Sequence, residues 1–80
     1  MRTVYLLQSI NHPNQTYIGA TEDVSARLKQ HSSGHSSHSS KFAPWRCVVY
    51  VQFEDDRKAN AFERYLKTGS GRAFAERHFW

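Results

Sequence analysis

The run TYIGATEDVSARLKQH at residues 16–31 changes the spacing of its apolar residues partway along. Residues 16–20, TYIGA, are rich in β-branched and aromatic types, which favours a strand. Beyond them, one helical face carries residues at i, i+3, i+4 and i+7, namely Val24, Arg27, Leu28 and His31. We therefore predict a strand followed by a helix from about Glu22 to Ser32, with Thr21 as its N-cap.

A second β-prone run, TVYLLQS at residues 3–9, precedes this one. The two runs are separated by NHPN at residues 11–14, whose residue types commonly form turns. Two β-prone runs joined by a short turn predict a β-hairpin.

The middle of the chain predicts a loop and a third strand. Residues 32–40, SSGHSSHSS, have no apolar side chain to bury, so we expect a mobile loop there. Residues 46–53, RCVVYVQF, form the most β-prone run of the chain, and we expect them to be the central strand.

Two further helices are predicted after this strand. Asp55 and Asp56 offer an N-cap and an acidic first turn, and Gly69 is expected to end the helix. One face of this helix carries Ala59, Phe62, Glu63 and Leu66. The run RAFAERHF at residues 72–79 predicts a short third helix that docks by its aromatic side chains. The order β-β-α-β-α-α predicts one α/β domain of the α+β type over residues 1–80, with a three-stranded mixed or antiparallel sheet and flanking helices.

Composition narrows the class of protein. Eleven Lys and Arg against seven Asp and Glu give a net charge of +4 and a pI near 9.6, which attracts polyanions. Nucleic acid is the leading partner, although many small domains carry surplus lysines for solubility alone. Cys47 is the only cysteine, which excludes an intramolecular disulfide and a four-cysteine zinc site and favours a reducing, cytoplasmic setting. We expect no signal peptide and no membrane segment, because nowhere do about eighteen apolar residues follow one another.

Three ionisable residues fall on helical faces that packing alone would make apolar. Arg27 and His31 lie one turn apart beside Val24 and Leu28. Glu63 lies on the apolar face of the later helix, where a carboxylate needs a cation. Arg27 and His31 either extend from the edge of the core into solvent or serve a site. Glu63 either pairs with an arginine or binds a metal ion.

Two tyrosines and a glycine complete the set of candidate residues. Tyr5 and Tyr17 lie on neighbouring predicted strands, which can present both phenols on one face of the sheet. Tyrosines in strands are ordinarily packing residues. Gly19 differs, because a glycine within a strand leaves room for another backbone or a ligand to approach.

In chain order these residues resemble the GIY-YIG nuclease family, which occurs in homing endonucleases, some restriction enzymes and the N-terminal domain of the excinuclease C subunit. The first family motif corresponds to Val4-Tyr5-Leu6, and the second, Tyr17-Ile18-Gly19, is intact. The family's Arg-x-x-x-His on the first helix corresponds to Arg27 and His31, and Glu63 matches its metal-binding glutamate. Five features in the right order make this a specific signal.

The resemblance covers nearly the whole chain and is closest to the small stand-alone members, with a few departures. Val4 and Leu6 replace the glycine and isoleucine of the first motif. Ala20 replaces a basic residue that some relatives carry, and the family's late asparagine has no clear counterpart in residues 69–72.

The resemblance implies an endonuclease that hydrolyses phosphodiester bonds in DNA, with nicking, structure-selective cleavage and DNA repair as the corresponding roles. It implies one divalent ion, Mg²⁺ or Mn²⁺, at Glu63, and Arg27 against the scissile phosphate. Tyr5 or His31 would help to deprotonate the attacking water, and Tyr17 would position the water or the phosphate. The residues expected to contact nucleic acid are Gly19, Lys29, His35, His38, Lys41, Lys67 and Arg72.

Two other interpretations stay open at this point. The chain could be a nucleic-acid-binding module that keeps the fold without cutting. It could instead store or sense metal, with His35 and His38 joining His31 in a zinc or nickel site. A metal store needs neither a basic surface nor Glu63, and retention of all five polar positions favours the nuclease.

Overall fold

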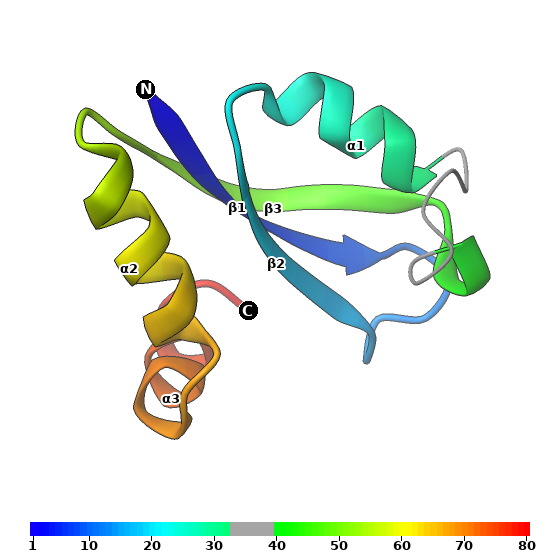
Figure 1. The fold of residues 1–80 in the computed structure, drawn as a ribbon. Coiled ribbons are helices and arrows are strands. Elements are labelled where there is room, and N and C mark those ends of the chain that lie inside the picture. Colours follow the sequence, from blue (N-terminus) through cyan, green and yellow to red (C-terminus); the bar gives the residue numbers. More distant parts are fainter. Residues whose placement is uncertain (33–39) are drawn as a thin grey trace.

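The computed structural model describes residues 1–32 and 40–80. The predicted serine-rich loop, with His35 and His38, falls largely on residues 33–39, outside the described part. The elements in chain order are β1 (Arg2–Ser9), β2 (Thr16–Thr21), α1 (Val24–Ser32), the 3₁₀ helix η1 (Ser40–Phe42), β3 (Trp45–Phe53), α2 (Asp56–Leu66) and α3 (Gly69–His78) (Figure 1). The predicted order β-β-α-β-α-α is confirmed. None of the helices in the described ranges is long and apolar enough to cross a membrane.

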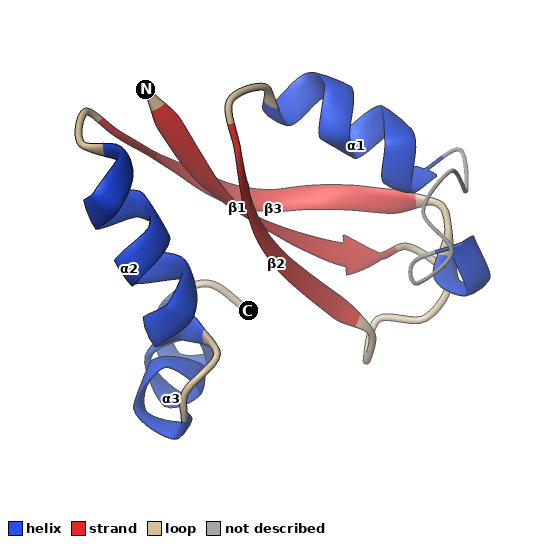
Figure 2. Ribbon diagram, viewed as in Figure 1, coloured by secondary structure: helices blue, strands red, loops and turns tan. Residues whose placement is uncertain are grey.

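The three strands form one antiparallel sheet, and its central strand is β1 (Figure 2). The prediction that residues 46–53 lie at the centre is therefore wrong, because the strand order is β2-β1-β3. In β1 the consecutive residues 3–7 are all buried, as expected of a strand covered on both faces. In β3, by contrast, Arg46, Tyr50 and Gln52 are exposed. High β-propensity indicates a fit to a pleated surface and does not indicate a position within the sheet.

Successive residues of β1 point to opposite faces of the sheet and build two cores. The face covered by α2 and α3, here called the α2–α3 face, has a core of Val4, Leu6, Ala59, Leu66 and Ala75. The face covered by α1, here called the α1 face, has a core of Tyr5, Leu7 and Trp45, with Tyr17, Val24, Leu28 and Cys47 packed around it. Both predicted helical faces, on α1 and on α2, therefore meet the sheet.

A bulge in β3 keeps that strand in phase with both cores. Leu6 of β1 pairs with Val49, while Leu7 pairs with Cys47, so that Val48 is an extra residue on β3. Cys47 consequently packs on the α1 face and Val49 on the α2–α3 face.

Aspartates cap the first two long helices. Asp55 caps α2, as predicted. α1 begins at Val24 and is capped by Asp23 rather than by Thr21, because Asp23 Oδ1 accepts from the Ala26 backbone N–H at 3.1 Å. Thr21 Oγ1 instead accepts from the Asp23 N–H at 3.2 Å, in the turn before the helix. The residue directly before the first turn is the one that can reach its unpaired N–H groups.

α2 ends at Leu66, and Gly69, which was expected to stop it, opens α3. Thr68 caps α3 by accepting from the Gly71 N–H at 3.1 Å. A Cβ atom on Gly71 would lie 1.8 Å from the Tyr65 carbonyl oxygen, so this glycine lets α3 start directly against the end of α2. The predicted glycine break is thus the first turn of a helix, and α3 is longer than expected.

Candidate active site

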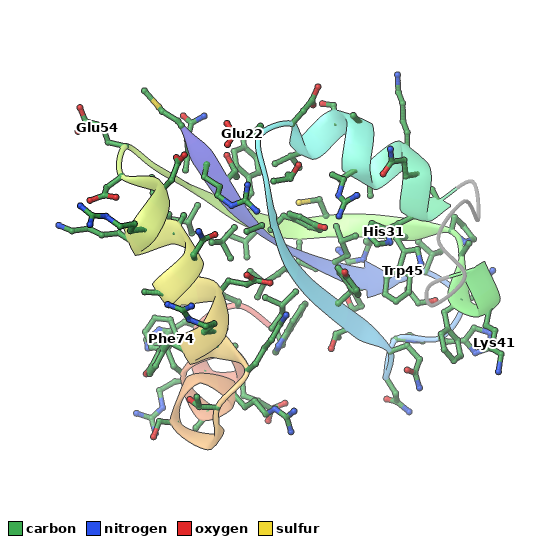
Figure 3. The ribbon with its side chains drawn as sticks, viewed as in Figure 1. Glu22, His31, Lys41, Trp45, Glu54 and Phe74 are labelled. Carbon is green, nitrogen blue, oxygen red and sulfur yellow. The ribbon has the colours of Figure 1, made fainter. Side chains whose placement is uncertain are left out.

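Tyr5 lies at the centre of a polar cluster on the α1 face. Its side chain is 1% exposed, and its Oη atom lies 3.5 Å from Nε2 of the buried His31. The Tyr17 ring stacks on Tyr5 with centroids 6.2 Å apart, and it lies 4.6 Å from the His31 ring. Figure 3 shows His31 pointing from α1 toward the sheet. Two strands and a helix thus bring together three of the predicted site residues.

Gly19 makes this arrangement sterically feasible. It lies opposite Tyr5 in the pairing of β1 with β2. A Cβ atom at Gly19 would lie 2.5 Å from Tyr5 Oη, so any other residue at this position would displace the phenol. We expected the space beside Gly19 to admit a ligand or another backbone. It is occupied instead by the Tyr5 phenol, which lies across the edge strand β2.

The charges of Arg27 and Glu63 both act on the Tyr5 phenol. Burial raises the pKa of Tyr5, the hydrogen bond and positive charge of Arg27 lower it, and the charges of Tyr17 and Glu63 raise it. Burial outweighs the arginine, so the pKa of Tyr5 stays above its ordinary value and the phenol is protonated at neutral pH. Arg27 itself is exposed, and its Nη1 also donates to Gln30 Oε1 at 3.1 Å. Arg27 therefore reaches both the buried phenol and solvent.

Glu63 on α2 is paired with Lys67, one turn further along the helix. Lys67 Nζ donates to Glu63 Oε2 at 3.0 Å, and the two side chains are 53% and 23% exposed respectively. The sequence-based expectation was an arginine or a metal ion at this carboxylate. The signal in the sequence that would have found this partner is a glutamate four residues before a lysine, which the sequence analysis did not use.

Glu63 can supply one carboxylate ligand to a divalent ion, but not a complete set of ligands. Within the described ranges, no three His, Cys, Asp or Glu side chains gather into a metal-binding group. Mg²⁺ is commonly held by one or two carboxylates together with waters and substrate phosphates. A single carboxylate therefore fits such an ion when DNA supplies further oxygens. Lys67 occupies one of the carboxylate oxygens in the protein alone.

The other residues predicted to contact nucleic acid lie in separate places. Lys29 is exposed on α1, and Lys41 lies in η1, at the opposite end of the sheet from α2 and α3 (Figure 3). Lys67 and Arg72 line a groove of about 990 Å³ that also includes Tyr17. Only these two cations of the set thus lie in a groove with a predicted catalytic residue, among the residues that the structure describes.

Trp45 packs against the cluster, although no sequence pattern singled it out. It is 5% exposed, and its ring lies 6.5 Å from the His31 ring. Ser32 Oγ accepts from the Trp45 N–H at 3.1 Å and donates to the Trp45 carbonyl at 3.0 Å. The end of α1 is thereby fixed to the start of β3, which holds His31 under Tyr17.

The fold and the tyrosine-centred cluster define a known class of catalytic domain. The GIY-YIG catalytic domain model matches residues 1–76. The chain belongs to the GIY-YIG family, as its two tyrosine motifs indicated.

Similar proteins include fungal proteins that carry one name, "Structure-specific endonuclease subunit SLX1". The protein of Candida dubliniensis is 35% identical over 82 residues, which cover 94% of this chain and 27% of the relative. The protein of Debaryomyces hansenii is 36% identical over 72 residues, covering 80% of this chain and 20% of the relative. The protein of Malassezia globosa is 40% identical over 50 residues, covering 59% of this chain and 11% of the relative. The chain thus spans about a quarter or less of the length of these relatives.

Proposed function

We propose that this chain hydrolyses phosphodiester bonds in DNA and selects branched or otherwise irregular DNA structures. The observation that carries the proposal is the convergence of polar side chains on the buried Tyr5 hydroxyl, from Tyr17, His31 and Arg27. The name of the fungal relatives, structure-specific endonuclease subunit, supports DNA structure as the selected feature. It also supports action as one subunit of a larger nuclease.

Arg27 is suited to meet the scissile phosphate. A guanidinium binds phosphate oxygens with two parallel hydrogen bonds, and Arg27 is exposed while its charge and hydrogen bond also act on the pKa of Tyr5. A phosphate would draw the guanidinium away from the phenol and uncover the Tyr5 hydroxyl. The same guanidinium would then stabilise the charge that develops on the phosphate oxygens during attack.

Tyr5 and His31 together offer a route for the proton of the attacking water. The raised pKa of Tyr5 argues against a free phenolate as the base. In our proposal the water passes a proton to Tyr5 Oη while the phenol proton moves to His31 Nε2, 3.5 Å away. The hydroxide forms a bond to phosphorus, the opposite P–O bond breaks, and the leaving oxygen takes a proton from solvent. Tyr17 packs on His31 and keeps the imidazole in position.

Glu63 is the residue that would hold a divalent ion, and divalent-metal dependence is general among GIY-YIG nucleases. We propose one ion, Mg²⁺ or Mn²⁺, which would neutralise charge on the phosphate and on the leaving oxygen. The ion would compete with Lys67 for Glu63 Oε2, the oxygen that the ammonium group contacts in the protein alone. The Lys67–Glu63 pair is then the arrangement that precedes substrate binding.

The test is cleavage of labelled branched, duplex and single-stranded DNA in Mg²⁺, in Mn²⁺ and in chelator. We expect cleavage of branched DNA that requires metal, and its loss in Glu63→Gln. Glu54→Gln is the matched control, because Glu54 is exposed in the connection between β3 and α2 and points away from the sheet (Figure 3). Cleavage in chelator, or wild-type rates in Glu63→Gln, would contradict the metal assignment. Tight binding without cleavage in any metal would identify a module that binds DNA and does not cut.

A further inference from the structure

Arg2, at the start of the central strand β1, joins three other parts of the fold with one side chain. Its Nε donates to Asn60 Oδ1 on α2 at 2.8 Å, and its Nη2 donates to the Ala20 carbonyl on β2 at 3.4 Å. Its Nη1 lies 3.7 Å from Glu22 Oε1, in the turn between β2 and α1 that Figure 3 labels. A single guanidinium therefore links the central strand, the edge strand β2 and α2.

The hydrogen bond to Asn60 is the strongest of these contacts. Arg2 and Asn60 are both partly buried, whereas the Glu22 side chain is 62% exposed, so the ion pair with Glu22 is screened by water. The Ala20 contact, at 3.4 Å, is longer than a typical N–H···O bond. The Arg2–Asn60 pair, here called the Arg2–Asn60 clamp, thus fixes α2 to the start of β1.

The candidate site has two parts that lie on different sides of the sheet. Glu63 is on α2, while His31 and the Tyr5 phenol are on the α1 face, and Figure 1 shows α1 and α2 on the two sides of β2. The two parts approach each other at β2, because the phenol lies over Gly19 and the charge of Glu63 acts on the pKa of Tyr5. An ion held by Glu63 and a phosphate at Tyr5 can meet only if the spacing between α2 and β2 is correct.

Asn60 is well placed to set that spacing for Glu63. It lies three residues before Glu63 on α2, so the two side chains share one face of the helix. The ion pair of Glu63 with Lys67 lies within α2 and cannot fix the helix against the sheet. The buried residues of α2, Ala59 and Leu66, make apolar contacts, which have no preferred direction. A hydrogen bond does have a preferred direction, so the clamp can define the position of α2.

We propose that Arg2 and Asn60 are positioning residues for the metal ligand Glu63. The clamp holds α2 where the Glu63 carboxylate reaches an ion that also contacts the phosphate, while neither clamp residue touches ion or phosphate. This inference rests on the proposed function, since it takes Glu63 to bind the ion. A clamp that serves stability alone is the competing interpretation.

The first test is the Mg²⁺ dependence of cleavage of branched DNA. Arg2→Ala and Asn60→Ala should each raise the half-maximal Mg²⁺ concentration about tenfold, the usual effect of removing a residue that orients a metal ligand. The maximal rate in saturating Mg²⁺ should stay unchanged, because the bound ion draws Glu63 into place. Either change opens the same clamp, so the double variant should need no more Mg²⁺ than each single variant.

The second test measures metal binding without cleavage. In a Tyr5→Phe background, which lacks the hydroxyl of the proposed proton route, Mn²⁺ is titrated into the complex with branched DNA and the free ion is followed by electron paramagnetic resonance. We expect the Mn²⁺ dissociation constant to rise about tenfold in Arg2→Ala and in Asn60→Ala. It should rise at least as much in Glu63→Gln, which removes the ligand itself.

Two variants of the same region control for charge and for stability. Arg57→Ala removes an exposed arginine from the first turn of α2 and leaves the clamp intact. Asp55→Ala removes the N-cap of α2 and should lower the Tm by about 4–8 °C. Both should keep the wild-type half-maximal Mg²⁺ concentration, measured at a temperature where each variant is folded.

The outcomes separate the clamp from the proposed function. If Arg2→Ala and Asn60→Ala lower the Tm as Asp55→Ala does but keep the wild-type metal dependence, the clamp is only structural. Effects that multiply to about a hundredfold in the double variant would also overturn the proposal, since the two residues would then act independently. If the wild-type chain cuts no DNA in any metal, the proposed function fails, and this inference with it. If cleavage requires metal and Glu63 while the clamp variants behave like Arg57→Ala, only this inference fails.

Discussion

The two faces of β1 differ sharply in what they bury. On the α2–α3 face, Val4 and Leu6 meet buried side chains that are all apolar. On the α1 face, the intervening residue Tyr5 is buried beside His31, also buried, and Tyr17. Buried polar groups cost free energy unless they are hydrogen-bonded, and no buried polar side-chain atom in the described ranges lacks a partner. The alternation of one strand thus separates an apolar core from the polar cluster around Tyr5.

The largest effect should come from the α2–α3 face. Leu6 is fully buried there, so Leu6→Ala should lower the free energy of unfolding by about 2–5 kcal/mol. Because Leu6 points away from the cluster, the cleavage rate per folded molecule should stay at the wild-type value. Urea denaturation and a rate normalised to the folded fraction measure the two quantities. A large loss of rate in well-folded Leu6→Ala would show that the two faces are not independent.

Arg27→Ala should show the reverse pattern on the α1 face. We expect the cleavage rate to fall by about a hundredfold, because one preorganised donor to the transition state is worth on the order of 3 kcal/mol. Stability should change by no more than about 0.5 kcal/mol, since Arg27 is exposed. Arg77→Ala, another exposed arginine, controls for the loss of one positive charge. A variant that unfolds while keeping its rate per folded molecule would make Arg27 a structural residue.

Replacement of a glycine by alanine can be made once beside α2 and α3, at Gly71, and once beside the Tyr5 cluster, at Gly19. In Gly71→Ala the new methyl group would meet the Tyr65 carbonyl oxygen, so α3 must shift at a cost of about 1–3 kcal/mol in stability with the rate unchanged. In Gly19→Ala it would meet the end of the Tyr5 phenol, which can rotate. We expect about 1 kcal/mol of destabilisation and about a tenfold loss of rate, because the phenol is displaced from its position beside His31. Thermal melts and cleavage assays on both variants test the contrast. Equal stability losses with intact rates would mean that the position of Tyr5 does not matter for cleavage.

Local patterns predicted the elements of the fold but not their order in the sheet. The hairpin, the helical face around His31 and the Asp55 cap all follow from neighbours in sequence, and all three are present. The position of β1 at the centre depends on which strands pair, and β-propensity carries no such information. The choice of Asp23 over Thr21 as the cap of α1 depended on a difference of two residues in the start of the helix, which periodicity does not resolve.

The candidate site, like the fold, has features that local sequence patterns predicted and features that depend on distant contacts. The motif resemblance and the alternation of strand residues placed Tyr5 and Tyr17 on one face, and the structure brings both to His31. The crossing of Tyr5 over Gly19 was not predictable, because it depends on the pairing register of β1 with β2. The part played by Trp45 depends on the distant contact between the end of α1 and β3. The chemical roles of these residues stay predictions.

The smallest effect should come from Lys67, at the C-terminal end of α2. Its ion pair with Glu63 is a partly exposed i,i+4 pair, so Lys67→Ala should lower the free energy of unfolding by only about 0.3–0.5 kcal/mol. The same substitution removes the cation that competes with a divalent ion for Glu63 Oε2. The Mg²⁺ concentration that gives half-maximal cleavage should therefore fall by about twofold, the equivalent of that pairing energy.

Lys58→Ala is the matched control for this effect, because Lys58 is exposed on the same helix and forms no ion pair within the described ranges. It removes the same charge from α2 without freeing Glu63, so its half-maximal Mg²⁺ concentration should equal that of the wild type. Both titrations need saturating DNA, since Lys67 also lines the groove and its loss should weaken DNA binding. If Lys67→Ala needs more Mg²⁺ than Lys58→Ala, Lys67 assists metal binding instead of opposing it. The Lys67–Glu63 pair would then belong to the reacting arrangement rather than to the one that precedes it.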